Sequence, residues 1–239
     1  MNILKAILLG LIQGVSEFFP ISSSGNLYFY SSLFNIKAYT VSFDILIHAA
    51  SLLALIFVYF NDIVHMVKNP SARMNKLVGV GILPIFIVSV LFQRKIDSFF
   101  LNSKALGLCF IFSGAVLFYE TMYNPGKKHF KNMNIKDSAL IGVFQTVGVI
   151  PAVSRTSMAI CGGLQRGFDG KTSLKYAYIM AVPAILGRIV SDMVKLYMDT
   201  NNTVTDVFGP VSMLLALVTA FVVSVVSIRV MQRIAAKGK

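Results

Sequence analysis

Residues 10–26 have the sequence GLIQGVSEFFPISSSGN, which breaks an apolar segment with an acid, a proline and three serines. The apolar arms before and after the break, within residues 3–34, are each shorter than the roughly 20 apolar residues that a membrane-spanning helix needs. Broken backbone at membrane depth is tolerated only where it is buried in protein or lines a wet cavity. The stretch therefore predicts a re-entrant hairpin of two short helices.

A second segment, residues 137–166, has the same design. Its apolar run is broken by PAVSRTS at 151–157 and then resumes. Gln145 precedes this break much as Gln13 precedes the first one, which indicates a weak internal repeat. Hairpins that enter a membrane from opposite faces are typical of inverted repeats, whose sites lie near the midplane between the halves.

The rest of the chain predicts helices that cross a membrane. The composition is 56% hydrophobic and only 13% charged, about half the charged fraction of a soluble domain. We expect an all-α, polytopic membrane helical bundle, with residues 1–239 as one integral membrane domain whose halves cover about 1–123 and 137–239. Five stretches are predicted to span: 42–60, 76–93, 104–123, 173–197 and 208–233.

The net charge of +12 fits the same topology. Lys and Arg gather in loops that alternate helices place on one side, as the positive-inside rule requires, so nucleic acid is not an expected partner. The N-terminus is then outside and the C-terminus inside. The loop residues counted inside are Lys68, Arg73, Lys76, Lys127, Lys128, Lys131, Lys136, Arg166, Lys171, Lys175, Arg229, Arg233, Lys237 and Lys239.

Cys109 and Cys161 lie in apolar runs and are expected to be buried free thiols. The apolar N-terminal run lacks a small-residue cleavage site and is expected to be retained.

Glu17 is the first candidate site residue. It follows Gln13 by four positions, so both side chains share one helix face. A carboxylate at membrane depth costs about 2.5 kcal/mol or more on insertion scales, and such residues are usually functional. The alternative is a carboxylate near the lipid headgroups without a function.

The segment Ser22-Ser23-Ser24-Gly25-Asn26 is the second candidate. Serines just before a helix offer hydroxyls and free backbone N–H groups at the positive end of the helix dipole, which binds anions. An ordinary N-cap is the alternative for these serines taken alone.

Arg155, flanked by Ser154 and Thr156, is the third candidate. It lies at the second break, far from any aqueous loop, and needs an anionic partner there. Its planar fork fits a phosphate or diphosphate well. A structural ion pair with Glu17 is the alternative, and both interpretations are compatible in one protein.

Four further polar residues in apolar helices are weaker candidates. His48 follows Asp44 by four positions, and a lone histidine in an apolar helix is more often a packed residue. Arg188 and Asp192 have the same spacing and are interpreted as a structural pair near the outer end of their helix.

The motifs EFFPISSSG (17–25) and PAVSRTS (151–157), with AVPAILG at 181–187, resemble the signatures of the undecaprenyl-diphosphatase family, also known as the bacitracin-resistance phosphatases. The resemblance covers nearly the whole chain. It implies six spans with two re-entrant hairpins in an inverted repeat. It also implies hydrolysis of undecaprenyl diphosphate to the monophosphate at the outer face of the plasma membrane, usually with a divalent cation.

The resemblance also assigns roles to residues. Gln13 and Glu17 match the acidic motif, Ser23 matches a catalytic serine, and Arg155 matches a phosphate-binding arginine. Four residues depart from the family pattern: Asn26 stands where a histidine is usual, and Ala152, Thr156 and Ala159 replace the usual Gly, Ser and Thr.

We therefore expect hydrolysis of a long-chain polyprenyl diphosphate, with Glu17, Ser23 and Arg155 as catalytic residues. Mg²⁺ or Ca²⁺ would be held by Glu17 and Gln13, because such ions prefer oxygen ligands. A lipid-phosphate flippase or anion transporter and a structural membrane subunit are the alternatives. Whether Ser23 is the nucleophile or orients a water stays open, and a homodimer is possible. The candidate substrate-binding residues are Gln13, Ser22, Ser24, Gly25, Asn26, Ser154 and Thr156.

Overall fold

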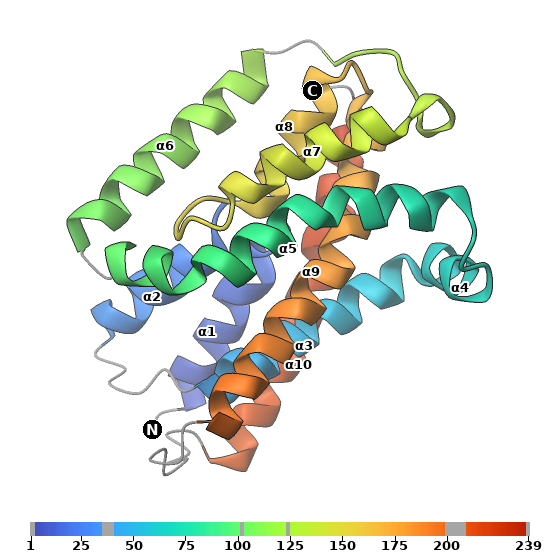
Figure 1. Ribbon diagram of the computed structural model, residues 1–239. Helices are drawn as coiled ribbons and strands as arrows, with labels where there is room; N and C mark the ends of the chain where they lie inside the picture. Colours follow the sequence, from blue (N-terminus) through green and yellow to red (C-terminus); the bar gives the residue numbers. More distant parts are fainter. Residues whose placement is uncertain (1–2, 35–40, 101–102, 123–124, 199–208, 238–239) are drawn as a thin grey trace.

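The computed structural model describes residues 3–34, 41–100, 103–122, 125–198 and 209–237 (Figure 1). This part of the chain is helical, with no β-strand among the described residues, which confirms the predicted all-α class. The helices are α1 (Ile3–Ser16), α2 (Ser23–Leu33), α3 (Val41–Val58), α4 (Phe60–Lys68), α5 (Arg73–Phe100), α6 (Ser103–Met122), α7 (Ile135–Val147), α8 (Arg155–Gln165), α9 (Gly170–Met198) and α10 (Pro210–Ala236), with a short 3₁₀ turn at Phe130–Asn132.

Both predicted hairpins are present as pairs of short helices, α1–α2 and α7–α8. In each pair the second helix begins after a capping serine. The Ser22 Oγ atom accepts a hydrogen bond from the Gly25 N–H, and the Ser154 Oγ atom accepts one from the Ser157 N–H. These caps satisfy backbone donors that would otherwise be buried without partners. The two breaks are thus built alike.

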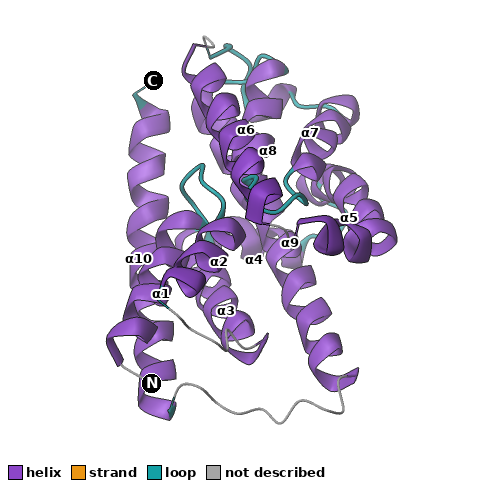
Figure 2. Cartoon of the chain, turned by 90° about the vertical axis from the view of Figure 1, so that its left-hand side faces the viewer, coloured by secondary structure: helices purple, strands orange, loops and turns teal. Residues whose placement is uncertain are grey.

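Each hairpin packs against a long helix of the other half of the chain. Helix α1 lies along α10, and α7 lies along α5. Small residues allow both close approaches, since a side chain at Gly14 would collide with α10 and one at Gly142 with α5. The α1–α2 hairpin lies toward the N-terminal end of the molecule and the α7–α8 hairpin toward the opposite, C-terminal end (Figure 2). This exchange of partners is the arrangement that an inverted repeat predicts.

Four helices of the described residues are long and apolar enough to cross a membrane: α3, α9, α10 and the Arg73–Phe92 part of α5. The predicted fifth span, 104–123, corresponds to α6. Within its described residues, Ala105–Glu120 forms a shorter apolar helix than the other four.

The long helices α3 and α9 pack against each other, and α10 packs on α3. Cys109 and Cys161 are buried free thiols, as expected.

Candidate active site between the two hairpin tips

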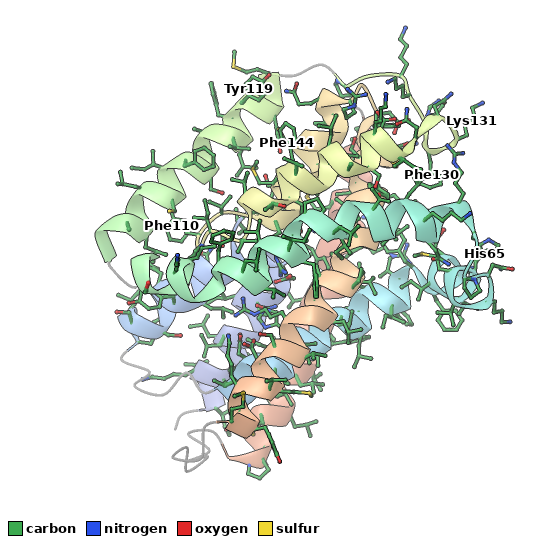
Figure 3. The ribbon with its side chains drawn as sticks, in the orientation of Figure 1. His65, Phe110, Tyr119, Phe130, Lys131 and Phe144 are labelled. Atoms are coloured by element: carbon green, nitrogen blue, oxygen red, sulfur yellow. The ribbon has the colours of Figure 1, made fainter. Side chains whose placement is uncertain are left out.

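The tips of the two hairpins meet inside the bundle. A side chain added at Gly25 would place its Cβ atom 2.7 Å from the Ala152 Cα atom, so the first residues of α2 lie against the second tip. The Thr156 hydroxyl donates to the Glu17 carbonyl oxygen over 3.3 Å. Phe110 of α6 and Phe144 of α7, labelled in Figure 3, pack against the apolar cluster that contains Ala152. The predicted meeting of the two motifs is therefore a direct contact.

Glu17 and Arg155 form an ion pair across this contact. The Arg155 Nη2 atom lies 3.2 Å from the Glu17 Oε1 atom. The Glu17 side chain is only 6% exposed and the Arg155 side chain 22%. Removing one partner of a buried pair leaves the other charge uncompensated, which typically costs about 3–5 kcal/mol. The pair therefore holds the two hairpins in register while Arg155 keeps some of its surface open.

Gln13 lies behind Glu17 and is fully buried. Its Nε2 atom lies 3.3 Å from both the Glu17 Oε2 atom and the Ser51 Oγ atom. The Ser224 hydroxyl of α10 donates to Ser51 in turn. The Gln13 Oε1 atom has no hydrogen-bond partner among the described residues. A buried carbonyl oxygen next to a carboxylate is the kind of site where a cation ligand is expected.

His48 lies on the far side of Glu17, on α3. Its Nε2 atom is 3.9 Å from the Glu17 Oε2 atom, and its Nδ1 atom is 3.1 Å from the Asp44 Oδ1 atom. The Arg188 Nη2 atom of α9 lies 2.8 Å from the Asp44 Oδ2 atom. Asp44 and His48, which the sequence marked only as weaker candidates, therefore belong to the polar network around Glu17. Their four-residue spacing within an apolar helix was the signal that could have given them more weight.

A cavity of about 580 Å³ opens beside the Glu17–Arg155 pair. Both hairpin breaks, α5 and α9 line it. Seven of the predicted site residues are on its wall: Glu17, Ser22, Ser23, Ser24, Ser154, Arg155 and Thr156.

Three of the predicted substrate-binding residues are not on that wall. Gln13 is behind Glu17, and Gly25 is packed against Ala152. The Asn26 Nδ2 atom donates to the Ser22 carbonyl oxygen over 2.7 Å. Asn26 therefore braces the first hairpin tip instead of facing the cavity.

Among the three serines of the first motif, Ser23 is the one best placed for chemistry. The Ser22 Oγ atom is engaged in the helix cap and lies 3.2 Å from the Ser24 Oγ atom. The Ser23 and Glu17 side chains line the same cavity wall. A carboxylate in that position can accept the serine proton.

The outer part of the cavity wall carries charges that the sequence pattern did not assign to the site. The predicted i, i+4 pair is present, with 3.5 Å between the Arg188 Nε atom and the Asp192 Oδ2 atom. Lys195 lies 3.0 Å from the Asp192 Oδ1 atom. All three of these α9 residues also line the cavity. Their interpretation as purely structural was incomplete, because a helical spacing does not show which cavity a pair faces.

Comparison with known proteins agrees with this geometry. The family model "Bacitracin resistance protein BacA" matches residues 6–239. The chain is 32% identical over 201 residues to the undecaprenyl-diphosphatase of Carboxydothermus hydrogenoformans, covering 84% of this chain and 77% of that protein. It is 31% identical over 205 residues to undecaprenyl-diphosphatase 3 of Bacillus cereus, covering 86% and 79%. It is 27% identical over 250 residues to the undecaprenyl-diphosphatase of Methanobrevibacter smithii, covering 96% and 88%.

The matched residues include both hairpins and all of the long helices. Together with the four apolar helices, this match identifies a multi-pass membrane protein. The chain belongs to the bacitracin resistance protein BacA family.

Proposed function

We propose that this protein hydrolyses undecaprenyl diphosphate to undecaprenyl monophosphate and inorganic phosphate, and so recycles a lipid carrier of cell-envelope synthesis. The observation that carries the proposal is the Glu17–Arg155 pair on the wall of a cavity that Ser23 also lines. The relatives of this family bear the name undecaprenyl-diphosphatase. Their names favour hydrolysis over transport of an intact lipid phosphate.

The cavity provides groups that bind and polarise a diphosphate. The guanidinium of Arg155 matches two phosphate oxygens, and it stands at the first position of α8, where the helix dipole is positive. Helix α2 begins at Ser23 on the same cavity wall. Phosphoryl transfer depends mainly on positioning and on neutralising charge, which is what these groups supply.

Two routes break the bond between the bridging oxygen and the terminal phosphorus. In the first, the Ser23 Oγ atom attacks the terminal phosphorus, its proton passes to the Glu17 carboxylate, and undecaprenyl monophosphate leaves. Water then hydrolyses the phosphoserine and releases inorganic phosphate. In the second, Glu17 and Ser23 orient a water that attacks directly. Both routes use Glu17 and Ser23, which line the same cavity wall.

The charges on the cavity wall support the proposal that a divalent cation takes part. Arg155, Arg188 and Lys195 are each held by a carboxylate of Glu17, Asp44 or Asp192. The site is therefore close to neutral before substrate binds, and a diphosphate would add two or three negative charges. An additional cation is the simplest means of compensating them.

The residues present fit Mg²⁺ or Ca²⁺. Glu17 offers a carboxylate, and Gln13 offers a buried Oε1 atom that has no hydrogen-bond partner among the described residues. The described residues hold no group of three or more His, Cys, Asp or Glu side chains arranged to bind a metal ion by themselves. One or two protein oxygens plus phosphate oxygens and waters is the usual environment of Mg²⁺ at phosphate sites. When bound, the ion would neutralise the developing charge on the phosphate oxygens.

We place the protein in the plasma membrane with the cavity open to the outer face. The cavity extends along α9 from Arg155 toward Lys195, near the end of that helix which the basic-loop pattern puts outside. The loops richest in Lys and Arg would then face the cytoplasm.

The direct test is release of inorganic phosphate from undecaprenyl diphosphate by the purified protein in detergent, with and without EDTA. We expect phosphate release that EDTA abolishes and added Mg²⁺ or Ca²⁺ restores. Binding of the lipid without any phosphate release would refute hydrolysis.

A further inference from the structure

The cavity has an apolar flank that the polar chemistry does not use. Between α5 and α9 it forms a slot, lined by Phe86 and Val90 on one side and by Pro183, Gly187 and Val190 on the other. Phe86 is 62% exposed and Val190 is 52% exposed, so the slot opens at the surface of the bundle. In a membrane protein that surface faces lipid.

Gly187 shows that the slot is open space. A Cβ atom added at Gly187 would have no atom within 4 Å, apart from the helix itself. At Gly14 and Gly142, by contrast, the absence of a side chain allows a neighbouring helix to come close. Gly187 is exposed on a membrane-spanning helix, and its lack of a side chain does not serve a contact with another helix. Glycine at such a position costs about 1 kcal/mol of helix stability relative to alanine.

The slot and the charged end belong to one continuous cavity. Arg155 and Glu17 line it at one end and Phe86, Val90 and Val190 line it along α5 and α9. An amphiphile with an anionic head and a branched apolar chain matches such a lining, because its head needs the guanidinium and its chain gains from burial at about 0.8 kcal/mol per methylene.

We propose that the slot between α5 and α9 is the lateral entrance for the substrate and holds the isoprene units next to the diphosphate, with Gly187 providing the space. The inference rests on the proposed function and adds the residues that recognise the chain. It places the prenyl chain of the lipid in this slot and not in a second apolar groove, which lies between α5 and α7.

That second groove is the competing path. It is lined by Pro84, Ile87, Phe92, Val143 and Val147, among others. It touches the first cavity at Val149, which lines both. Neither Glu17 nor Arg155 lines it. A diphosphate lipid whose head lies at Arg155 therefore reaches the α5–α9 slot without leaving the cavity, whereas the groove is a separate space that shares only Val149 with it.

Gly187→Leu tests the proposal, because its Cβ atom would have no described atom within 4 Å and the rest of the side chain adds bulk to the slot. Gly114→Leu on α6 is the matched control, since Gly114 is also an exposed helical glycine with nothing within 4 Å and does not line the cavity. Val143→Trp fills the competing groove. For each purified variant we would measure kcat and KM for undecaprenyl diphosphate and the inhibition constant of inorganic pyrophosphate, which has no chain.

We expect Gly187→Leu to raise KM about tenfold or more, which corresponds to about 1.4 kcal/mol of lost chain contacts. Pyrophosphate should inhibit this variant as well as it inhibits the wild type, and Gly114→Leu should leave both constants within about twofold. An unchanged KM in Gly187→Leu would overturn the proposal. So would a rise in KM for Val143→Trp alone, or an equal weakening of pyrophosphate, which would place the effect at the polar end.

Failure of the proposed function has a different signature. In that case the wild type itself releases no phosphate. The slot is then tested by binding of radiolabelled undecaprenyl diphosphate, which Gly187→Leu must weaken and Gly114→Leu must not. Equal binding by both variants would overturn the slot assignment.

Discussion

The Arg155 Nη2 atom lies 3.2 Å from the Glu17 Oε1 atom, although the two residues are 138 positions apart in the chain. Each residue comes from the break of a different hairpin, and the hairpins come from opposite ends of the bundle (Figure 2). The inverted arrangement thus places an acid and a guanidinium together inside the membrane. Each one compensates the buried charge of the other.

Arg155→Lys should show that the shape of this cation matters as well as its charge. Lysine keeps the positive charge but loses the planar fork that meets two phosphate oxygens. We expect phosphate release to fall by roughly 10²–10³-fold, the range found when a donor to a developing oxyanion is removed. Arg229→Lys, at an exposed arginine that donates to Gln232, is the control and should retain full activity. Near-normal turnover in Arg155→Lys would contradict bidentate binding.

Gln13 should affect the cation requirement. Gln13→Glu adds a second carboxylate beside Glu17 and should lower the Mg²⁺ concentration that gives half-maximal activity, whereas Gln13→Ala should raise it. Gln145→Ala is a close control, because Gln145 is 1% exposed and also has a buried Oε1 atom without a partner among the described residues. A Mg²⁺ titration that is identical for all four proteins would exclude Gln13 as a ligand.

Ala152 has a backbone φ of +65°, in the left-handed region that favours glycine. It is fully buried at the second hairpin tip, against Gly25. Ala152→Gly relieves the strain but loses a buried methyl group, so we expect a change in unfolding free energy within about 1 kcal/mol. Ala152→Val places a β-branched residue in that conformation and should destabilise by about 2 kcal/mol or more. Thermal unfolding of the detergent-solubilised variants measures both changes. An unfolding midpoint of Ala152→Val equal to that of the wild type would show that the strain is unimportant.

Asp169 should make stability depend on pH at the start of α9. Burial acts to raise the pKa of this carboxyl group, but the Thr172 N–H, which donates to Oδ1 over 2.6 Å, and the nearby His129 ring lower it below its usual value. A carboxyl group whose pKa is lower in the folded state stabilises the fold fully above its unfolded pKa of about 3.9, and that contribution is lost as pH falls through the folded pKa.

Asp169→Ala should therefore cost about 1 kcal/mol at pH 7, the typical value of a lost helix cap. The difference from the wild type should shrink as the pH falls below about 4. Unfolding midpoints compared at pH 7 and pH 3 provide the check. A difference between the two midpoints that is larger at pH 3 than at pH 7 would contradict a lowered pKa of Asp169.

The sequence predicted the fold through its breaks. Pro20 with the serines, and Pro151 with Ser154, interrupt apolar runs that are too short to span, and only a hairpin satisfies both facts. The repeat of this design then placed Glu17 near Arg155. Such inferences succeed because every backbone polar group at membrane depth needs a hydrogen-bond partner, and few structures meet that requirement.

The sequence could not show which faces of the long helices meet. His48 and Asp44 share a face at four-residue spacing, but their role near Glu17 depends on α3 packing against α9 and α1. Arg188 contacts Asp44 across that same packing. The role of Asn26 could not be predicted for a different reason. Its side chain donates a local hydrogen bond to the Ser22 carbonyl oxygen, and the place of Asn26 in the motif does not reveal that bond.

Glu17→Gln is the most direct test of the acid–guanidinium site. Glutamine preserves the size of the side chain and its contact with Arg155, but it cannot accept a proton from Ser23 or a water. We predict that the purified variant folds, still binds undecaprenyl diphosphate, and releases inorganic phosphate at least about 10²-fold more slowly than the wild type, the typical contribution of a general base. A Glu17→Gln protein with wild-type phosphate release would contradict the account.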